Sequence, residues 1–463
     1  MGLSTFHSLN TAARGLEAAR AQIAITAQNT ANAGTVGYTR QSAQLQSLPG
    51  VQPTGLFTSP TGAGQGVEVA GIGRSASELI NRQVRGAVAQ SGFQQIRAEA
   101  YSGIEDVLRE PGDGSVSSAV NAYHSAWQDL ANNPGDAGAG AALLEAARSL
   151  AGRLRADVQQ LKDQYAAQGN ELRAELGQVN SLAEQLAQIN GAIRSTGAAG
   201  GSTNELLDHR DQIAEQLSAL TGGQLRPAVD GTGEFLVGGN ALVSGETVKP
   251  LAVGEAADGT TIVQWEHRSG SAGVDGGSLA GRLSVLSAEG PLAGAIQGYD
   301  NLAKTLADGT NTAYAAGVLP GETAPPVPAP TFFSYAEGDA ASSLSVVVSD
   351  PTTIRHAAAG AGKLDGSVAD GISNLGESVT RGWTGFVSEV GSASRSALNG
   401  LSLSVGTESS ARASQQSLAS VDRDEEAVNL VTFQHAYQAS ARVLTAVDEM
   451  LDTLINRVGL VGR

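Results

Sequence analysis

Residues 430–458 read LVTFQHAYQASARVLTAVDEMLDTLINRV, and their apolar side chains recur in a 4-3 rhythm. The rhythm is carried by Leu430, Phe433, Tyr437, Leu444, Val447, Leu451, Leu454 and Val458, and only Ser440 interrupts it. Apolar residues spaced about 3.5 positions apart line one side of an α-helix and form the seam of a coiled coil. The C-terminal segment therefore predicts a long helix with one apolar contact face.

The N-terminal segment carries a second stripe with the same spacing, formed by Leu9, Ala12, Leu16, Ala19 and Ile23. This stripe predicts one helix over residues 5–31. A lone helix of about 30 residues is only marginally stable in water. We therefore expect the two ends to pair with each other or with copies of the chain, and to order fully only when neighbours cover the stripes.

The rest of the chain predicts a mainly α fold with a small all-β insert, in nested domains: terminal coiled-coil helices plus an elongated helical bundle. Periodic segments predict helices from 75 to 109, 116 to 132, 138 to 195, 203 to 221, 279 to 316 and 366 to 416. Short alternating runs separated by glycines predict strands within 223–276. The expected domains are a terminal assembly domain (1–40 and 423–463), a helical bundle with short β segments (41–222 and 277–422) and the β insert (223–276).

Composition excludes several classes of protein. The 463 residues carry a formal net charge of −17, which disfavours nucleic acid and anionic membranes as partners because phosphate binding needs clustered Lys and Arg. There are no cysteines, and no apolar run approaches the roughly 20 residues of a membrane helix. The first 25 residues lack the apolar run of a secretory signal. We expect export, if it occurs, to proceed without a cleaved signal peptide.

No arrangement of residues indicates catalysis, a cofactor or a metal. The six histidines are scattered, without the spacing of a metal site, and no nucleophile elbow or phosphate loop is present. The acidic cluster from Asp422 to Glu426 is interpreted as the cap of the last helix. Arg40 and Arg442 are interpreted as solvated surface residues.

A turn follows the first helix, in the stretch Asn29-Thr-Ala-Asn-Ala-Gly-Thr-Val-Gly-Tyr-Thr-Arg40. Asn32 and Gly34 suit a left-handed helix end, and Gly37 can supply a second positive φ. Tyr38 offers a flat anchor with one polar end. From the residues alone, a capped helix end is a sufficient interpretation.

The same stretch resembles the Asn-x-x-Asn-x-x-Thr-x-Gly-Tyr signature of bacterial flagellar rod, hook and hook-associated proteins. Gly34 and Val36 depart from that pattern, in which Asn and then Pro or Ala are usual, whereas Asn32, Thr35, Gly37 and Tyr38 keep it. Residues 424–440 resemble the matching end signature. Asn204-Glu-Leu-Leu-Asp-His-Arg-Asp-Gln212 is similar to a segment of the hook-associated members at the hook–filament junction.

The resemblance implies a structural subunit of the flagellum that forms the first junction layer between hook and filament. It implies a ring of copies with terminal helices paired in an inner tube, exported by the flagellar type III apparatus to the cell exterior. Expected partners are further copies, hook protein, the second junction protein and an export chaperone on the C-terminal helix. The expected contact residues are Leu9, Leu16 and Ile23 with the eight C-terminal residues above.

Two other interpretations remain open. Within the same class, the chain could be a hook or distal-rod protein, although the Asn204–Gln212 segment and the long helices argue against this. From a different class, it could be a secreted coiled-coil adhesin with the β insert as its ligand module.

Overall fold

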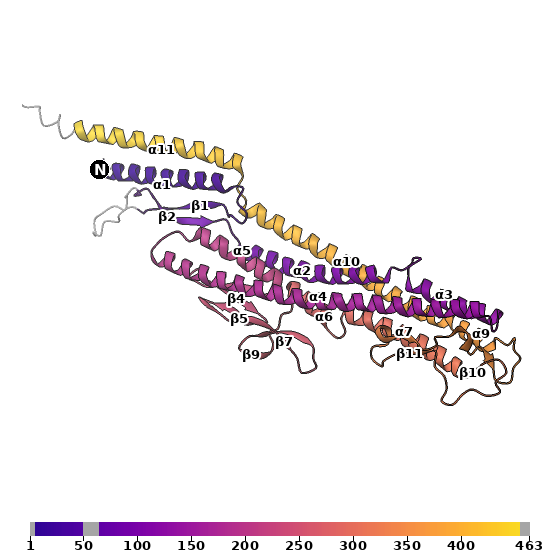
Figure 1. Ribbon diagram of the computed structural model, residues 1–463. Helices are drawn as coiled ribbons and strands as arrows, with labels where there is room; N and C mark the ends of the chain where they lie inside the picture. Colours follow the sequence, from indigo (N-terminus) through magenta and orange to yellow (C-terminus); the bar gives the residue numbers. More distant parts are fainter. Residues whose placement is uncertain (1–4, 50–63, 454–463) are drawn as a thin grey trace, which may run out of the picture.

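A computed structural model describes residues 5–49 and 64–453. It is an elongated, mainly helical molecule with a small β insert on one side, which confirms the predicted fold class (Figure 1). Helices α1 (Thr5–Asn32) and α11 (Arg423–Asp452) lie side by side at one end. The remaining long helices continue away from them. They are α2 (Glu78–Leu108), α3 (Val116–Asn132), α4 (Ala137–Ala198), α5 (Asn204–Thr221), α6 (Gly277–Leu286), α7 (Pro291–Ala315) and α10 (Gly376–Ala419).

Helix α4 runs the length of this helical part, which we call the bundle. Its N-cap is Asp136, whose carboxylate accepts hydrogen bonds from the amides of Gly138 and Ala139. The helix contains Gly169 and Gly177, yet it is continuous over 62 residues, or roughly 90 Å. Each interior glycine costs about 1 kcal/mol relative to alanine. Packing along α4 offsets that cost, because buried leucines and valines recur from Leu143 to Ile193.

Two hydrophobic cores lie along α4. The core far from the termini contains an aromatic group formed by Tyr123, Trp127, Tyr299, Tyr314 and Phe332. The other core lies between α4, α5, α6 and the β insert, and includes Leu186, Leu217, Phe235 and Val263. Small elements complete the far end: β10 (Gly317–Val318), β11 (Phe333–Ser334), α8 (Ala340–Ser343), β12 (Ser345–Val346), a 3₁₀ turn (Pro351–Thr353), β13 (Ala357–Ala358) and α9 (Ser367–Ser373).

The β insert consists of two small antiparallel sheets docked on α4. One has the order β3-β4-β5-β6 and the other β7-β8-β9. The side-chain amide of Asn190 in α4 donates a hydrogen bond to the Gly233 carbonyl and accepts one from the Gly233 backbone amide. Asn180 makes the same pair of hydrogen bonds with Leu251. Each sheet is therefore fixed by one asparagine of the same helix. The strands are β3 (Gln224–Pro227), β4 (Gly233–Val237), β5 (Asn240–Ser244), β6 (Thr247–Val248), β7 (Leu251–Glu255), β8 (Thr261–Trp265) and β9 (Arg268–Ser271).

The structure differs from the sequence-based predictions in three places. The helix expected over 366–416 is divided into α9 and α10. The helix expected over 279–316 is two helices, because Gly290 caps a new helix and Pro291 occupies its first turn. The antiparallel hairpin β1 (Gln41–Ser47) and β2 (Val67–Arg74) packs along α1 rather than within the bundle, to which the sequence analysis assigned residues 41–74. We call α1, β1, β2 and α11 the arm, and the contacts between arm and bundle the joint.

Candidate functional site

The arm is built on two helices that run in opposite directions. A Cβ on Gly15 of α1 would lie 3.1 Å from the Ser440 Oγ of α11, and a Cβ on Gly34 would lie 3.9 Å from the side chain of Arg423. Two small residues therefore meet where the helices cross. Ser440, which interrupts the predicted seam, is the residue that allows this close approach.

The predicted seam of α11 faces α1 of the same chain. Val447 is buried, and Leu430, Phe433, Leu444 and Leu451 are half-buried, whereas 38% of the Tyr437 surface is exposed. Leu454 and Val458 lie outside the described residues. The seam is thus occupied within one chain, but among its described residues, Leu430 to Leu451, only Val447 is buried.

Of the stripe predicted on α1, Ala12 and Ala19 belong to the buried face, whereas the three larger residues lie at its edge. Leu9, Leu16 and Ile23 are half-buried. The buried apolar residues of α1 are Ala12, Ala18, Ala19 and Ile25. The buried face is shifted because the hairpin β1–β2 covers a second side of α1, a contact that helical periodicity alone does not reveal.

Helix α11 carries a second apolar stripe that the sequence analysis missed. Val428, Val431, Val443 and Met450 are 67%, 52%, 50% and 53% exposed, respectively. Val428 and Val431 lie on the side of α11 opposite the seam, whereas Val443 and Met450 directly precede the seam residues Leu444 and Leu451 and flank the seam. We call these four residues the outer stripe.

The turn after α1 keeps its shape through local hydrogen bonds. The backbone amide and hydroxyl of Thr35 both donate to Asn32, and the Tyr38 amide donates to the Thr35 carbonyl. Gly37 has a φ of +79°, as predicted. The left-handed conformation expected at Asn32 or Gly34 is wrong, because neither residue has a positive φ.

Asn29 is the central polar residue of this turn, and the sequence analysis did not single it out. Its side chain is buried and bonds the backbone of Gln41 in both directions. It also accepts a hydrogen bond of 2.8 Å from the Tyr38 hydroxyl. Burial, together with the carboxylates of Asp208 and Glu205, raises the pKa of Tyr38 to about 12. The signal for Asn29 was its place as the first Asn of the family signature.

Arg40 connects the turn to the start of α11, so its interpretation as a solvated residue was wrong. Its guanidinium lies 2.7 Å from Glu425 and 2.8 Å from Glu426. Glu426 is 2% exposed, so the ion pair compensates a buried charge. Asp422 caps α11 by accepting hydrogen bonds from the backbone amides of Asp424 and Glu425, as predicted. The sequence pattern does not predict this ion pair, because 385 positions separate Arg40 from Glu425.

The turn also contacts α5, so the two segments with family-like sequences meet in space. Asp208 Oδ2 accepts a hydrogen bond of 3.1 Å from the Thr39 amide. The Gln212 side chain donates to the Val36 carbonyl at 2.6 Å. The site residues of the turn and the Asn204–Gln212 segment therefore belong to one joint.

Across residues 5–49 and 64–453, no three His, Asp or Glu side chains are grouped so that they could hold a metal ion. No helix within those ranges is both long and apolar enough to cross a membrane. What the arm offers is contact surface, and the fold and arm together define an elongated structural protein with paired terminal helices.

Comparison of the sequence with known proteins shows similarity to flagellar proteins. Residues 101–325 match the family described as the flagellar hook-associated protein FlgK helical domain. Residues 416–457 match the flagellar basal body rod FlgEFG protein C-terminal family. Flagellar hook-associated protein 1 of Bacillus subtilis is 28% identical, and the alignment covers 99% of this chain and all of that protein. The chain is thus similar to flagellar hook-associated protein 1 along almost its whole length.

Other relatives match over a smaller part of their length. The Salmonella typhimurium and Escherichia coli proteins of the same name are 32% and 30% identical over 60% and 67% of this chain, which corresponds to 51% and 57% of their own lengths. The flagellar hook junction protein of Burkholderia pseudomallei shares the fold, with a TM-score of 0.60 and 16% identity. That alignment covers 73% of this chain and all of the solved chain.

Proposed function

We propose that this chain is a structural subunit of the bacterial flagellum, in the first junction layer between hook and filament. In this role it catalyses no reaction and holds no cofactor. Its contacts are with further copies in a ring, with hook protein on one side and with the second junction protein on the other. The match to the FlgK helical domain, the similarity to flagellar hook-associated protein 1 over almost the whole chain and the shared fold support this role.

The observation that carries the proposal is the outer stripe. The four side chains are apolar and remain exposed when α1 covers the seam, Val428 and Val431 on the opposite side of α11 and Val443 and Met450 at the edge of the seam. Burying a Val or Met side chain contributes roughly 1.5–3 kcal/mol relative to leaving it exposed. A second protein surface that covers the outer stripe therefore stabilises α11 as well as the assembly.

Another copy of the arm is the surface that fits the outer stripe. Between Arg423 and Asp452, α11 carries six acidic residues against two arginines, whereas α1 carries Arg14 and Arg20 against Glu17. Helices of opposite net charge attract each other, as α1 and α11 already do within one chain. The predicted seam residues and the outer stripe would then both lie in contacts, one within a subunit and one between subunits.

Export and delivery follow from the same proposal. The subunit leaves the cell through the flagellar type III apparatus, without a cleaved signal peptide. An export chaperone covers the C-terminal helix until assembly, which keeps its apolar residues from self-association.

The test replaces Val431 and Val443 together with Gln in cells that make no other junction protein of this type. Hooks are then isolated and examined by electron microscopy for attached filaments. We expect hooks without filaments, although the purified variant keeps the helical content of the parent. The matched control is Leu403→Gln, which changes an apolar residue of α10 that is 75% exposed and far from the arm. Normal filament attachment by the Val431/Val443 variant would overturn the proposal. An adhesin would show no filament defect in either variant.

A further inference from the structure

Helix α5 presents one polar face to the arm. The residues of this face, at positions i, i+1, i+4, i+7 and i+8, are Asn204, Glu205, Asp208, Asp211 and Gln212. The Asn204 side chain donates to the Ile72 carbonyl at 3.0 Å, and Glu205 accepts a bond of 2.9 Å from Gln28. The opposite face packs into the bundle through Ala214 and Leu217, which are fully buried. Helix α5 therefore contacts the arm with its polar face and the bundle with its apolar face.

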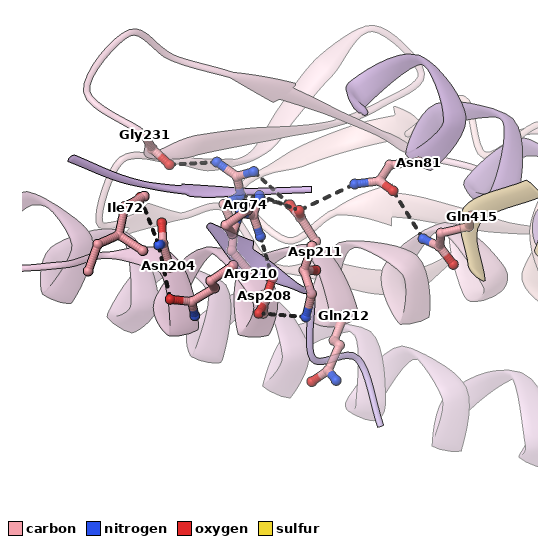
Figure 2. Close-up of polar contacts among 12 residues, drawn as sticks. Ile72, Arg74, Asn81, Asn204, Asp208, Arg210, Asp211, Gln212, Gly231 and Gln415 are labelled. Carbon is pink, nitrogen blue, oxygen red and sulfur yellow. Dashed lines mark hydrogen bonds and ion pairs between the residues drawn. The ribbon is translucent and has the colours of Figure 1, made fainter. Parts of the chain in front are cut away.

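Arg74, the last residue of β2, inserts between the two aspartates of this face (Figure 2). Its guanidinium lies 2.6 Å from Asp208 and 3.1 Å from Asp211. The three side chains are 11%, 6% and 14% exposed. At such burial the charges are compensated by each other rather than by water, so loss of one leaves another unbalanced.

Asp211 is itself held in place from the bundle side. Asp211 accepts two hydrogen bonds from Arg210, at 3.0 and 2.6 Å, and one of 3.4 Å from Asn81 of α2. Arg210 in turn donates to the Gly231 carbonyl in the β insert at 2.6 Å (Figure 2). The Asp211 carboxylate is thus fixed by bundle residues, and Arg74 is the arm residue that bridges it to Asp208.

The joint around these contacts is hollow. A cleft of about 740 Å³ separates the turn from α2, α5 and the end of α10, and it is lined by residues that include Thr35, Ser77, Gln416 and Val421. The chain crosses this region through short connectors, residues 75–77 and 420–422. Since no apolar core fills the joint, the polar contacts carry the task of fixing its geometry.

We propose that Asp208 and Asp211 form a clamp on Arg74 that fixes the angle between arm and bundle in the free subunit. The clamp, rather than the connector between α10 and α11, determines where the arm points. This assigns a positioning role to the Asn204–Gln212 segment. It concerns the isolated chain, so it stands or falls independently of the junction role proposed above.

The test measures arm geometry directly in the full-length monomer. The chain has no cysteines, so nitroxide labels can be attached at Gln438→Cys on α11 and Gln185→Cys on α4, both exposed positions. Pulsed electron paramagnetic resonance then gives the distribution of distances between the labels. We expect one narrow distribution in the parent and a broad one in Asp208→Asn/Asp211→Asn.

The matched control is Glu215→Gln. Glu215 lies one turn further along α5 and pairs at 2.7 Å with Arg412 of α10, a contact within the bundle. This variant is expected to keep the narrow distribution. A narrow distribution in the double variant, or equal broadening in the control, would overturn the clamp.

A second variant covers the case in which the double substitution disturbs folding of α5. Arg74→Gln leaves the bundle untouched, and its helical content and thermal melting are compared with those of the parent. The expected result is the same broadening of distances, with exchange of the Thr39 amide roughly 100-fold faster because its receptor is no longer held against the arm. Unchanged distances and unchanged exchange in Arg74→Gln would exclude the proposal.

Discussion

Replacing Arg40 with alanine should loosen the arm far more than the exposure of Arg40 suggests. The guanidinium binds two neighbouring carboxylates that differ in burial, since Glu425 is 54% exposed and Glu426 is 2% exposed. Loss of one partner of a buried pair costs about 3–5 kcal/mol, because the remaining charge is left without compensation. An exposed pair contributes about 1 kcal/mol or less. Almost all of the cost of Arg40→Ala is therefore assigned to Glu426.

The assay is amide hydrogen exchange in the first turn of α11, measured on the free subunit. A loss of 3 kcal/mol or more corresponds to exchange roughly 100-fold faster, since about 1.4 kcal/mol is a factor of ten. The matched variant Glu425→Gln removes the exposed contact with the same arginine and should change exchange by about fivefold or less. Of the three tryptophans, Trp127 and Trp383 lie in the bundle and Trp265 lies in the β insert, so their fluorescence reports whether the parts outside the arm are unaffected. Equal exchange in Arg40→Ala and Glu425→Gln would refute the assignment.

Three further substitutions have defined outcomes. Gly37→Ala should destabilise the arm by at least about 1 kcal/mol, because φ is +79° and a Cβ would clash with the Gln212 side chain of α5. Gly34→Ala should change the stability of the arm by no more than about 0.5 kcal/mol. Hydrogen exchange of the turn amides measures both effects. Gly15→Val should separate α1 from α11 at Ser440 at a cost of about 1–3 kcal/mol, seen as faster exchange in both helices while tryptophan fluorescence is unchanged. Burial lowers the pKa of His124 below its ordinary 6.5, so His124 binds a proton more readily in the unfolded chain than in the folded one. The free energy of unfolding should therefore fall as the pH drops below 6.5, by at most about 1.4 kcal/mol per pH unit. Urea unfolding between pH 7.5 and 5.5 measures this pH dependence, which should become flatter in His124→Gln.

Much of the secondary structure was predictable because its signals are local. Helix α3 begins and ends at the predicted residues 116 and 132, where a serine cap and an Asn-Pro-Gly turn bound the apolar period. The break before α7 carried an equally local signal in Gly290 and Pro291, which the periodicity of the flanking residues concealed. Local chemistry therefore predicts where elements end more reliably when Gly and Pro are weighed before periodicity.

The partners of each face were not predictable in the same way. The heptad pattern identified the seam of α11, but the pattern alone left open whether α1 or another copy covers it. Arg40 with Glu426, and Thr39 with Asp208, join residues 386 and 169 positions apart. No spacing rule connects such residues, because only the folded path of the chain brings them together. The two family-like segments, the turn after α1 and residues 204–212, were recognisable in the sequence, but the sequence does not show that they are in contact.

The outer stripe was missed for a different reason. The seam gives α11 a strong apolar periodicity, and the outer stripe does not interrupt it. A few further apolar residues outside that periodicity do not by themselves indicate a second contact surface. Once α1 is seen to cover the seam, exposure of the outer stripe becomes the informative observation. The free subunit thus presents α11 with one face paired and the other uncovered.

The most direct measurement is amide hydrogen exchange along residues 423–452, compared between the free subunit and assembled hook–filament junctions. With one face uncovered, α11 should exchange much faster than α4 in the free subunit and should become strongly protected on assembly. Strong protection already present in the free subunit and unchanged in the junction would mean that the arm is complete by itself, contradicting its role as a surface that other copies cover.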